Sequence, residues 1–208
     1  LFERHGKKIS VTSAGKKFLP YAENILKQYE DAVASIRETD NDYQGTIRVA
    51  TIYSIGLYDL QPTIKKLFKK YPKINLHLEY HQNAAIYEMA FNRTIDFGLV
   101  AFPQKKSGIV SETFVEEELI FVQSPDRRSI PKKHVSLKDL NTVRFIAFST
   151  LTPTGRTIHQ FFVKNNIRPH VVQEYDNIEL IKGAVLMGLG CAVLPQNTVA
   201  PELKERAL

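Results

Sequence analysis

The sequence has a single cysteine, Cys191, and no long apolar run. One cysteine allows no internal disulfide, which favours a reducing, cytoplasmic setting. No apolar stretch approaches the roughly 20 residues that span a bilayer, and residues 1–10 are polar and mostly charged, unlike a signal peptide. We therefore expect a cytoplasmic protein with no membrane segment.

Catalytic motifs are also lacking. There is no GxSxG elbow and no P-loop, and Gly188-Leu189-Gly190 lacks the third glycine of a dinucleotide fingerprint. Cys191 lies in an apolar strand, where a core role is favoured over a nucleophilic one. His77 and His81 flank Glu79, but neighbours along one strand are spread too far for a tetrahedral metal site. The sequence predicts no enzyme, no metal and no cofactor.

Charge is distributed unevenly along a chain of 208 residues whose net charge is +6. Residues 1–28 are basic, and residues 29–45 are acidic. With 43% hydrophobic residues the chain can bury a proper core. A basic end indicates contact with a polyanion, although a solvated helix surface would give the same pattern.

The N-terminal part predicts a hairpin followed by a long helix. Residues 2–11 form the hairpin, with Gly6 supplying the turn, and Thr12 caps a helix that reaches to about residue 44. Pro20 removes one helix hydrogen bond and predicts a local bend. Apolar residues recur at alternating spacings of four and three: Phe18, Ala22, Ile25, Tyr29, Ala32 and Ile36. This heptad seam predicts a helical dimer interface, the alternative being packing on the chain's own domain.

From residue 45 the pattern changes to alternating strands and helices. Expected strands are 47–51, 75–81, 95–100, 109–115, 118–123, 143–148, 170–174 and 190–194. Expected helices are 55–71, a short one around 86–90, 153–165 and 177–187. Such alternation predicts mostly parallel sheets covered by helices on both faces. The segment is long enough for two such lobes, with a ligand bound in the cleft between them.

Three expected helices begin with hydroxyl or amide residues after a strand. Ser54 precedes the first helix, Thr152 precedes Pro153, and Asp176 with Glu179 has capping-box spacing beside Asn177. Helix N-termini present free N–H groups and a partial positive charge, which suit an anion. The sequence therefore predicts a site for a small anionic or polar metabolite, ordinary capping being the alternative.

Several motifs together resemble one family. Leu1-Phe2-Glu3-Arg4 and Val11-Thr12-Ser13-Ala14-Gly15 are similar to the wing and linker-helix start of LysR-type regulators. Gly45 to Ala50 resembles the first strand of that family's effector domain, and Ile95-Asp96-Phe97-Gly98-Leu99 resembles a later strand. Gly188 to Pro195 resembles the "GxGxxxLP" strand, expected to cross back to the first lobe. These motifs occur in the family's order along essentially the whole chain.

The resemblance implies an α/β fold with a two-lobed, periplasmic-binding-protein-like effector domain preceded by a long dimerisation helix. Residues 1–11 would be a remnant of a winged helix-turn-helix wing, 12–44 the linker helix, and 45–208 the effector-binding domain. Lobe I would comprise about 45–118 and 195–208, and lobe II about 119–194. The family forms homodimers on the linker helices, and often homotetramers.

The resemblance also carries site residues. Contacts of the wing with the DNA backbone would come from Arg4, Lys7 and Lys8. The co-inducer would contact Thr51, Tyr53, Ser54, Ile55, Val100, Ala101, Thr150, Thr152 and Asn177. One departure is Arg93, which stands where the family usually has glycine, so Asn92 is expected to supply the left-handed turn instead.

The predicted function is transcription regulation by an attached winged helix-turn-helix head that responds to a small-molecule co-inducer. The main alternative is a solute-binding protein with the same two lobes, which would lack the heptad helix. An enzyme of the porphobilinogen-polymerising kind shares such lobes but would need its cofactor-bearing cysteine on a loop, whereas Cys191 is expected in an apolar strand.

Overall fold

The computed structural model describes residues 1–6, 8–36, 43–126 and 135–208. It divides into two compact units. The first contains Leu1–Thr51, Pro62–Leu99 and Lys105–Val110, and the second contains Ile52–Gln61, Val100–Gln104 and Ser111–Leu208. In the described part of the chain no helix is both long and apolar enough to cross a membrane.

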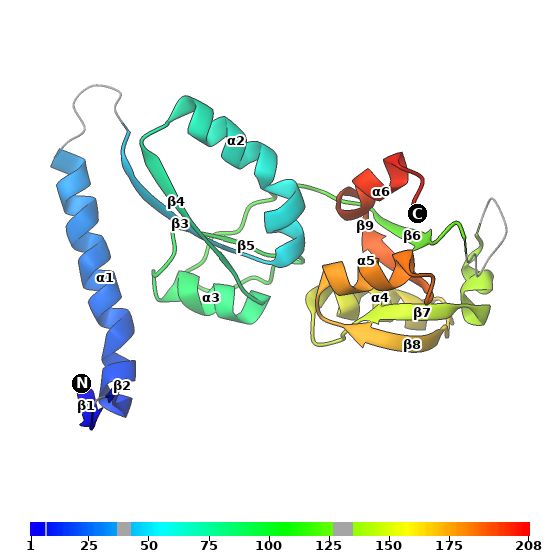
Figure 1. The fold of residues 1–208 in the computed structure, drawn as a ribbon, viewed down its shortest axis with the longest axis horizontal. Coiled ribbons are helices and arrows are strands. Elements are labelled where there is room, and N and C mark those ends of the chain that lie inside the picture. The colour runs from blue at the N-terminus through cyan, green and yellow to red at the C-terminus, as the bar shows by residue number, and fades with distance from the viewer. Residues whose placement is uncertain (7, 37–42, 127–134) are drawn as a thin grey trace. The chain divides into compact units, whose positions relative to one another are not determined.

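The N-terminus forms the expected hairpin and helix (Figure 1). Strands β1 (Phe2–His5) and β2 (Lys8–Val11) pair antiparallel, and Gly6 between them has φ +64°, a conformation that costs glycine little. Helix α1 (Ser13–Ile36) runs through Pro20. The Thr12 hydroxyl accepts a hydrogen bond from the Gly15 N–H at 3.1 Å, which confirms the predicted cap. The expected continuation of the helix over 37–42 lies outside the described residues.

The first unit contains a parallel three-stranded sheet. Strands β3 (Gly45–Thr51), β4 (Ile74–Tyr80) and β5 (Phe97–Leu99) lie in the order β4-β3-β5. Helices α2 (Gln61–Lys70) and α3 (Asn83–Phe91) lie on opposite faces of this sheet (Figure 1). Central β3 and the α3 face bury Val49, Ala50, Ile86 and Ile95.

The helix expected over residues 55–71 is interrupted. A short π-helical turn, η1 (Ile55–Asp59), precedes α2. Pro62 has no N–H to donate to the carbonyl of Tyr58, so a continuous α-helix would lose a bond there. The Leu60 N–H instead reaches back five residues to the Ile55 carbonyl at 2.8 Å. Pro62 then occupies the first turn of α2, where a missing donor is harmless.

The second unit contains a four-stranded sheet in the order β6-β9-β7-β8. Its strands are β6 (Leu119–Gln123), β7 (Arg144–Phe148), β8 (His170–Tyr175) and β9 (Cys191–Pro195). Strands β6 and β9 pair antiparallel, and the remaining pairs are parallel. Its helices are α4 (Pro153–Lys164), α5 (Ile178–Leu186) and α6 (Ala200–Lys204), with 3-10 turns η2 (Leu137–Thr142) and η3 (Gln196–Val199).

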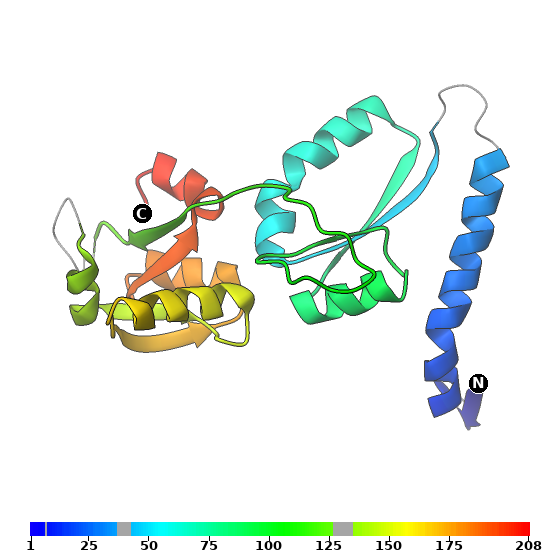
Figure 2. The same ribbon diagram turned by 180° about the vertical axis from the view of Figure 1, so that it is seen from behind.

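Helices α4 and α5 cover opposite faces of the second sheet, as the views from front and back show (Figure 2). The α5 side buries Ile146, Ile181 and Leu194, whereas the α4 side buries Phe145, Ile158 and Cys191. Cys191 is fully buried, and this burial raises the pKa of its thiol to about 12. The core role predicted for Cys191 is thereby confirmed.

Two sequence expectations about the chain's path were wrong. Residues 109–115 form no strand, because the sheet order leaves them without a neighbouring strand, and Val110 is 89% exposed. Residues 195–208 belong to the second unit rather than to the first lobe. After β9 the Gln196 N–H donates to the Glu118 carbonyl beside β6, so the chain stays on the second sheet.

The turn after α3 also differs from expectation. Arg93 itself adopts the left-handed conformation, with φ +58°, whereas Asn92 remains right-handed with φ −78°. Bonds from the Arg93 and Thr94 N–H groups to the carbonyls of Ala90 and Met89 close this helix end. These bonds offset part of the steric cost that a side chain meets in that region.

Candidate functional site

The first candidate feature is the N-terminus of α4, where the structure confirms the predicted cap. The Thr152 hydroxyl accepts from the Gly155 N–H at 3.0 Å and donates to the Ser149 carbonyl at 2.7 Å. Pro153 occupies the first helical turn. Because the hydroxyl proton is already used, Thr152 shapes the loop and cannot also donate to a ligand in this arrangement.

The loop before α4 is held by further contacts. Arg156 donates through Nη1 to the carbonyls of Thr150 and Leu151, at 3.3 and 2.8 Å. Gly155 lies so close that an added Cβ would fall 2.1 Å from the Ser149 carbonyl oxygen. These contacts hold the loop before α4 in place, and the side chain of Thr150 is exposed.

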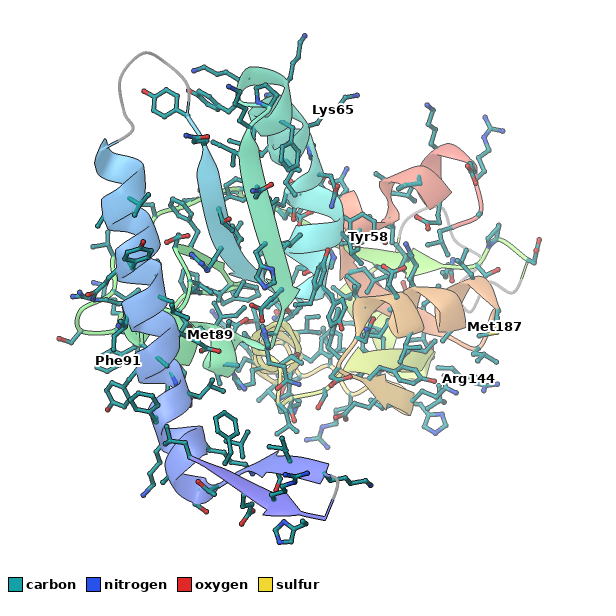
Figure 3. All side chains as sticks on the ribbon, turned by 60° about the vertical axis from the view of Figure 1, so that its left-hand side comes forward. Tyr58, Lys65, Met89, Phe91, Arg144 and Met187 are labelled. Carbon is teal, nitrogen blue, oxygen red and sulfur yellow. The ribbon has the colours of Figure 1, made fainter. Side chains whose placement is uncertain are left out.

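The second candidate feature is the N-terminus of α5. The Asn177 Oδ1 atom accepts from the Glu179 N–H at 2.8 Å. Asn177 is therefore the cap, and not Asp176, from which the capping box was predicted. The Tyr58 hydroxyl donates to Glu179 Oε1, which joins η1 to the first turn of α5 within the second unit; Tyr58 is labelled in Figure 3.

A buried lysine, Lys182, completes this junction. Its Nζ lies 3.0 Å from Glu202 Oε1 and 3.3 Å from Glu179 Oε2, and it donates to the Tyr58 hydroxyl and to the Thr198 carbonyl. Burial alone would lower the pKa of Lys182, but the bonds to Tyr58 and Glu202 outweigh it and raise that pKa. Lys182 is thus a fixed cation that ties η1, α5 and α6 together.

A second polar junction lies beside it. The backbone N–H of Asn197 donates to Glu117 Oε1 at 3.0 Å, and its side-chain amide donates to Asp59 Oδ1 at 2.9 Å. Burial raises the pKa of both carboxyls, and the charge of Asp59 raises that of Glu117 further. Asp59 Oδ2 is buried without a hydrogen-bond partner.

Neither junction was found by sequence reasoning. The available signal was Lys182, a lone cation in the otherwise apolar run Leu180 to Leu186 of α5. A lysine there indicates a buried, paired charge. Its partner Tyr58 lies 124 residues away, and no local pattern connects the two positions.

The remaining predicted effector residues divide between the units. Thr51 ends β3 in the first unit and is fully buried, with its carbonyl bonded to the His81 N–H. Tyr53, Ser54 and Ile55 belong to the second unit, as do Val100, Ala101, Thr150, Thr152 and Asn177. Ser54 is helical, with φ −58°, and makes no side-chain cap bond, so its predicted capping role is wrong. Ligand contact by these residues stays a prediction.

Helix α1 leaves much of its seam uncovered. Phe18, Ile25 and Tyr29 are 46%, 62% and 68% exposed, and Leu19 and Leu26 beside them are exposed as well. Ala22 is half-buried and Ala32 exposed, while the side chain of Ile36 lies outside the described residues. Contiguous apolar stripes of this kind are typical of surfaces that another element covers.

The opposite side of α1 touches the first unit's sheet region. Lys27 Nζ lies 2.5 Å from Asp96 Oδ1 and donates to the Arg93 carbonyl at 3.4 Å. Asp96 Oδ2 in turn accepts from the Arg48 N–H of β3 at 2.8 Å. One carboxylate therefore connects the helix to β3 and to the chain entering β5.

The predicted DNA contacts lie on the hairpin. Arg4 and Lys8 are exposed, and Arg4 Nε donates to the Gly6 carbonyl at 3.0 Å, while Lys7 lies outside the described residues. His77 of β4 and His81, which directly follows β4, each bond a different oxygen of Glu79, at 3.0 and 2.9 Å. These bonds lower the pKa of Glu79 and give both imidazoles a local partner.

The chain folds into two α/β units, each built on a sheet with helices, and comparison with known proteins gives the family. Residues 40–208 match the model of the LysR substrate binding domain. The chain is 32% identical, over 98% of its length and 69% of the relative's, to a probable RuBisCO transcriptional regulator of Thalassiosira pseudonana. The chain belongs to the LysR family of transcriptional regulators.

Solved structures show the same fold. A mutant of OxyR from Corynebacterium glutamicum, bound to H2O2, matches with a TM-score of 0.71 at 21% identity, over 98% of this chain and 64% of that one. The regulatory domain of CcmR from Synechocystis PCC6803, in complex with 2-PG, matches with a TM-score of 0.67 at 24% identity, over 75% and 74%. The chain thus spans about two thirds of the OxyR chain that it matches.

Proposed function

We propose that this chain is the dimerisation helix and sensing domain of a cytoplasmic LysR-type regulator, and that it binds a small anionic or polar metabolite. The contacts would come from the loops that follow β3, β5 and β7 and from the first turn of α5. Binding would alter how an attached winged helix-turn-helix head holds its DNA.

The observation that carries the proposal is the pair of capped helix ends in the second unit. The α4 end is rigidly held through Thr152 and Arg156, and the α5 end is capped by Asn177. The Tyr58–Glu179 bond brings η1, which follows Ser54, to the α5 end. Two N-termini and two hydroxyl-bearing loops in one compact unit suit an anion or a hydroxylated ligand. The 2-PG bound by CcmR makes an anionic ligand a reasonable first class to test.

A thermal-shift screen of the 208-residue chain tests this proposal. The panel would hold 2-PG, phosphoenolpyruvate, sulfate, citrate, O-acetylserine and aromatic acids. A ligand at a hundred times its dissociation constant stabilises by about 2.7 kcal/mol. For a protein of this size that corresponds to a shift of roughly 5–11 °C in the unfolding midpoint.

Variants then assign the site. Thr150→Val and Ser54→Ala should abolish the ligand shift while leaving the unliganded midpoint nearly unchanged. Thr152→Asn keeps an N-cap and should retain most of the shift, because the hydroxyl acts on the loop. Ser136→Ala is the matched control, since Ser136 caps η2, outside the proposed site. A ligand shift that survives both Thr150→Val and Ser54→Ala would place the site elsewhere.

We also propose that α1 pairs with α1 of a second copy through the heptad seam. The exposed seam residues support this assignment, because their burial would remove a large apolar area from water. Assembly into a tetramer, as the family resemblance implies, would require a further interface between dimers.

Sedimentation measurements on two charge-matched variants test the helix pairing. Ile25→Glu places a charge in the seam and should convert the dimer to monomer. Gln28→Glu adds the same charge to an exposed position off the seam and should leave the dimer intact. A chain that is monomeric at micromolar concentration, or equal dissociation by both variants, would contradict pairing through α1.

Ligand binding would reach the DNA through a change in the assembly of the chains. A ligand shifts the assembly only if it binds two arrangements with different affinity. The Lys27–Asp96 contact offers a physical route, because it connects α1 to the chain entering β5. Scattering profiles that are identical with and without a saturating ligand would argue against this route.

A further inference from the structure

Helix α2 carries a one-sided concentration of positive charge. Lys65, Lys66, Lys69 and Lys70 lie within ten residues, and all four are exposed. No acidic residue occurs between Asp59 and Glu79. Since the whole chain has a net charge of +6, this helix accounts for much of the excess.

The four lysines share one face of α2, called here the lysine face. At about 100° per residue they span an arc of roughly 140°. The half-buried side chains Ile64 and Leu67 occupy the opposite side. Lys65, labelled in Figure 3, points outward from the ribbon. Ile64 and Leu67 are thus less exposed than the four lysines of the lysine face, which are all in contact with water.

Within the described part of the chain, none of the four lysines of the lysine face forms an ion pair with a carboxylate. Lys70 contacts the ring of Tyr71, with its Nζ 5.0 Å from the ring centroid. The hydrogen bond to Tyr71 and the charge of that group raise the pKa of Lys70. Four like charges so close together repel one another and favour any polyanion that can neutralise them.

We propose that the lysine face of α2 is a sequence-independent contact for the DNA backbone, separate from the hairpin. Lysines at i and i+4 lie about 6 Å apart along a helix, and duplex DNA offers one phosphate charge per about 1.7 Å of its axis. A duplex can therefore neutralise the whole arc. Helix α2 contains no arginine, so its point charges would add affinity without reading bases.

The family's activity makes DNA the favoured polyanion. A regulator held on its operator keeps flanking duplex at high local concentration, so that even a weak contact is occupied. An acidic protein surface is the competing partner, and it would present fewer and less regular charges.

The test compares the DNA affinity of two triple variants that each lose three positive charges. The probe is a duplex of mixed sequence, about 30 base pairs long, and binding is measured by fluorescence anisotropy between about 50 and 200 mM KCl. Lys65→Gln, Lys66→Gln and Lys69→Gln together remove three charges from the lysine face. Lys138→Gln, Lys164→Gln and Lys204→Gln together remove three exposed charges from other elements. Circular dichroism checks that both variants keep the wild-type fold.

The α2 triple should weaken binding by at least about tenfold near 0.1 M salt and reduce the salt slope by roughly 2–3. The control triple should change both much less. Equal losses in the two triples, or no loss in the α2 triple, would overturn the proposal. Binding of wild-type chain to polyglutamate as tightly as to the duplex, with the same loss in the α2 triple, would assign the face to an acidic protein instead.

Discussion

Replacing Lys182 by methionine tests whether the junction of η1, α5 and α6 is held by a buried charge. The substitution keeps the aliphatic length and removes the ammonium, which bonds Glu202, Glu179, Tyr58 and Thr198. Glu202 is only 17% exposed, and its Oε2 is already buried without a partner. The variant therefore leaves a mostly buried carboxylate with no cation.

The expected cost follows from these exposures. Removing one member of a buried ion pair costs about 3–5 kcal/mol. The second carboxylate, that of Glu179, is 41% exposed and can be solvated, so the lower end of the range, about 3 kcal/mol, applies. For a chain of about 200 residues this lowers the unfolding midpoint by roughly 6–12 °C.

The assay is thermal and urea unfolding followed by circular dichroism. Lys182→Met combined with Glu202→Gln should recover about 1–2 kcal/mol, because the stranded charge is gone. Lys204→Met, at an exposed position, should stay within about 0.5 kcal/mol of wild type. A Lys182→Met variant that unfolds like Lys204→Met, or a double variant no more stable than the single one, would show that no buried charge holds this junction.

Three further outcomes are expected. Asp59→Asn should be more stable than wild type at pH 7 and should lose this advantage towards pH 4. Burial raises the pKa of Asp59, so its ionised form, which is present above that pKa, lowers the stability of the wild-type fold. Unfolding midpoints of both chains measured between pH 4 and pH 7 check the sign. Gly155→Ala should destabilise by about 2 kcal/mol through the clash with the Ser149 carbonyl, whereas Gly183→Ala, where an added Cβ meets no atom within 4 Å, should stabilise by about 0.5–1 kcal/mol. Cys191 should resist thiol reagents at pH 8 until the chain unfolds, because burial raises its pKa to about 12; modification at the rate of a free thiol in native buffer would contradict its position in the core.

Local sequence patterns determined much of this fold. The hairpin around Gly6, the Thr12 and Thr152 caps and the alternating strands and helices were all predicted from the sequence and are present. Each depends on residues a few positions apart: a glycine that tolerates positive φ, a hydroxyl three residues before a free N–H, or an apolar side chain at every helical turn.

Only the tertiary structure decided which segments meet. Residues 109–115 do not form the expected strand, because no strand of either sheet lies beside them to pair with. Residues 195–208 belong to the second unit. Lys182 donates a hydrogen bond to Tyr58, which lies 124 residues earlier in the chain. Asn197 donates hydrogen bonds to both Glu117 and Asp59. A hydrophobic periodicity or a cap motif can be read from a short window, because the backbone hydrogen bonds of a helix join residues only a few positions apart. The pairing of a buried charge depends on which surfaces pack together, and a single sequence does not specify this in any short window.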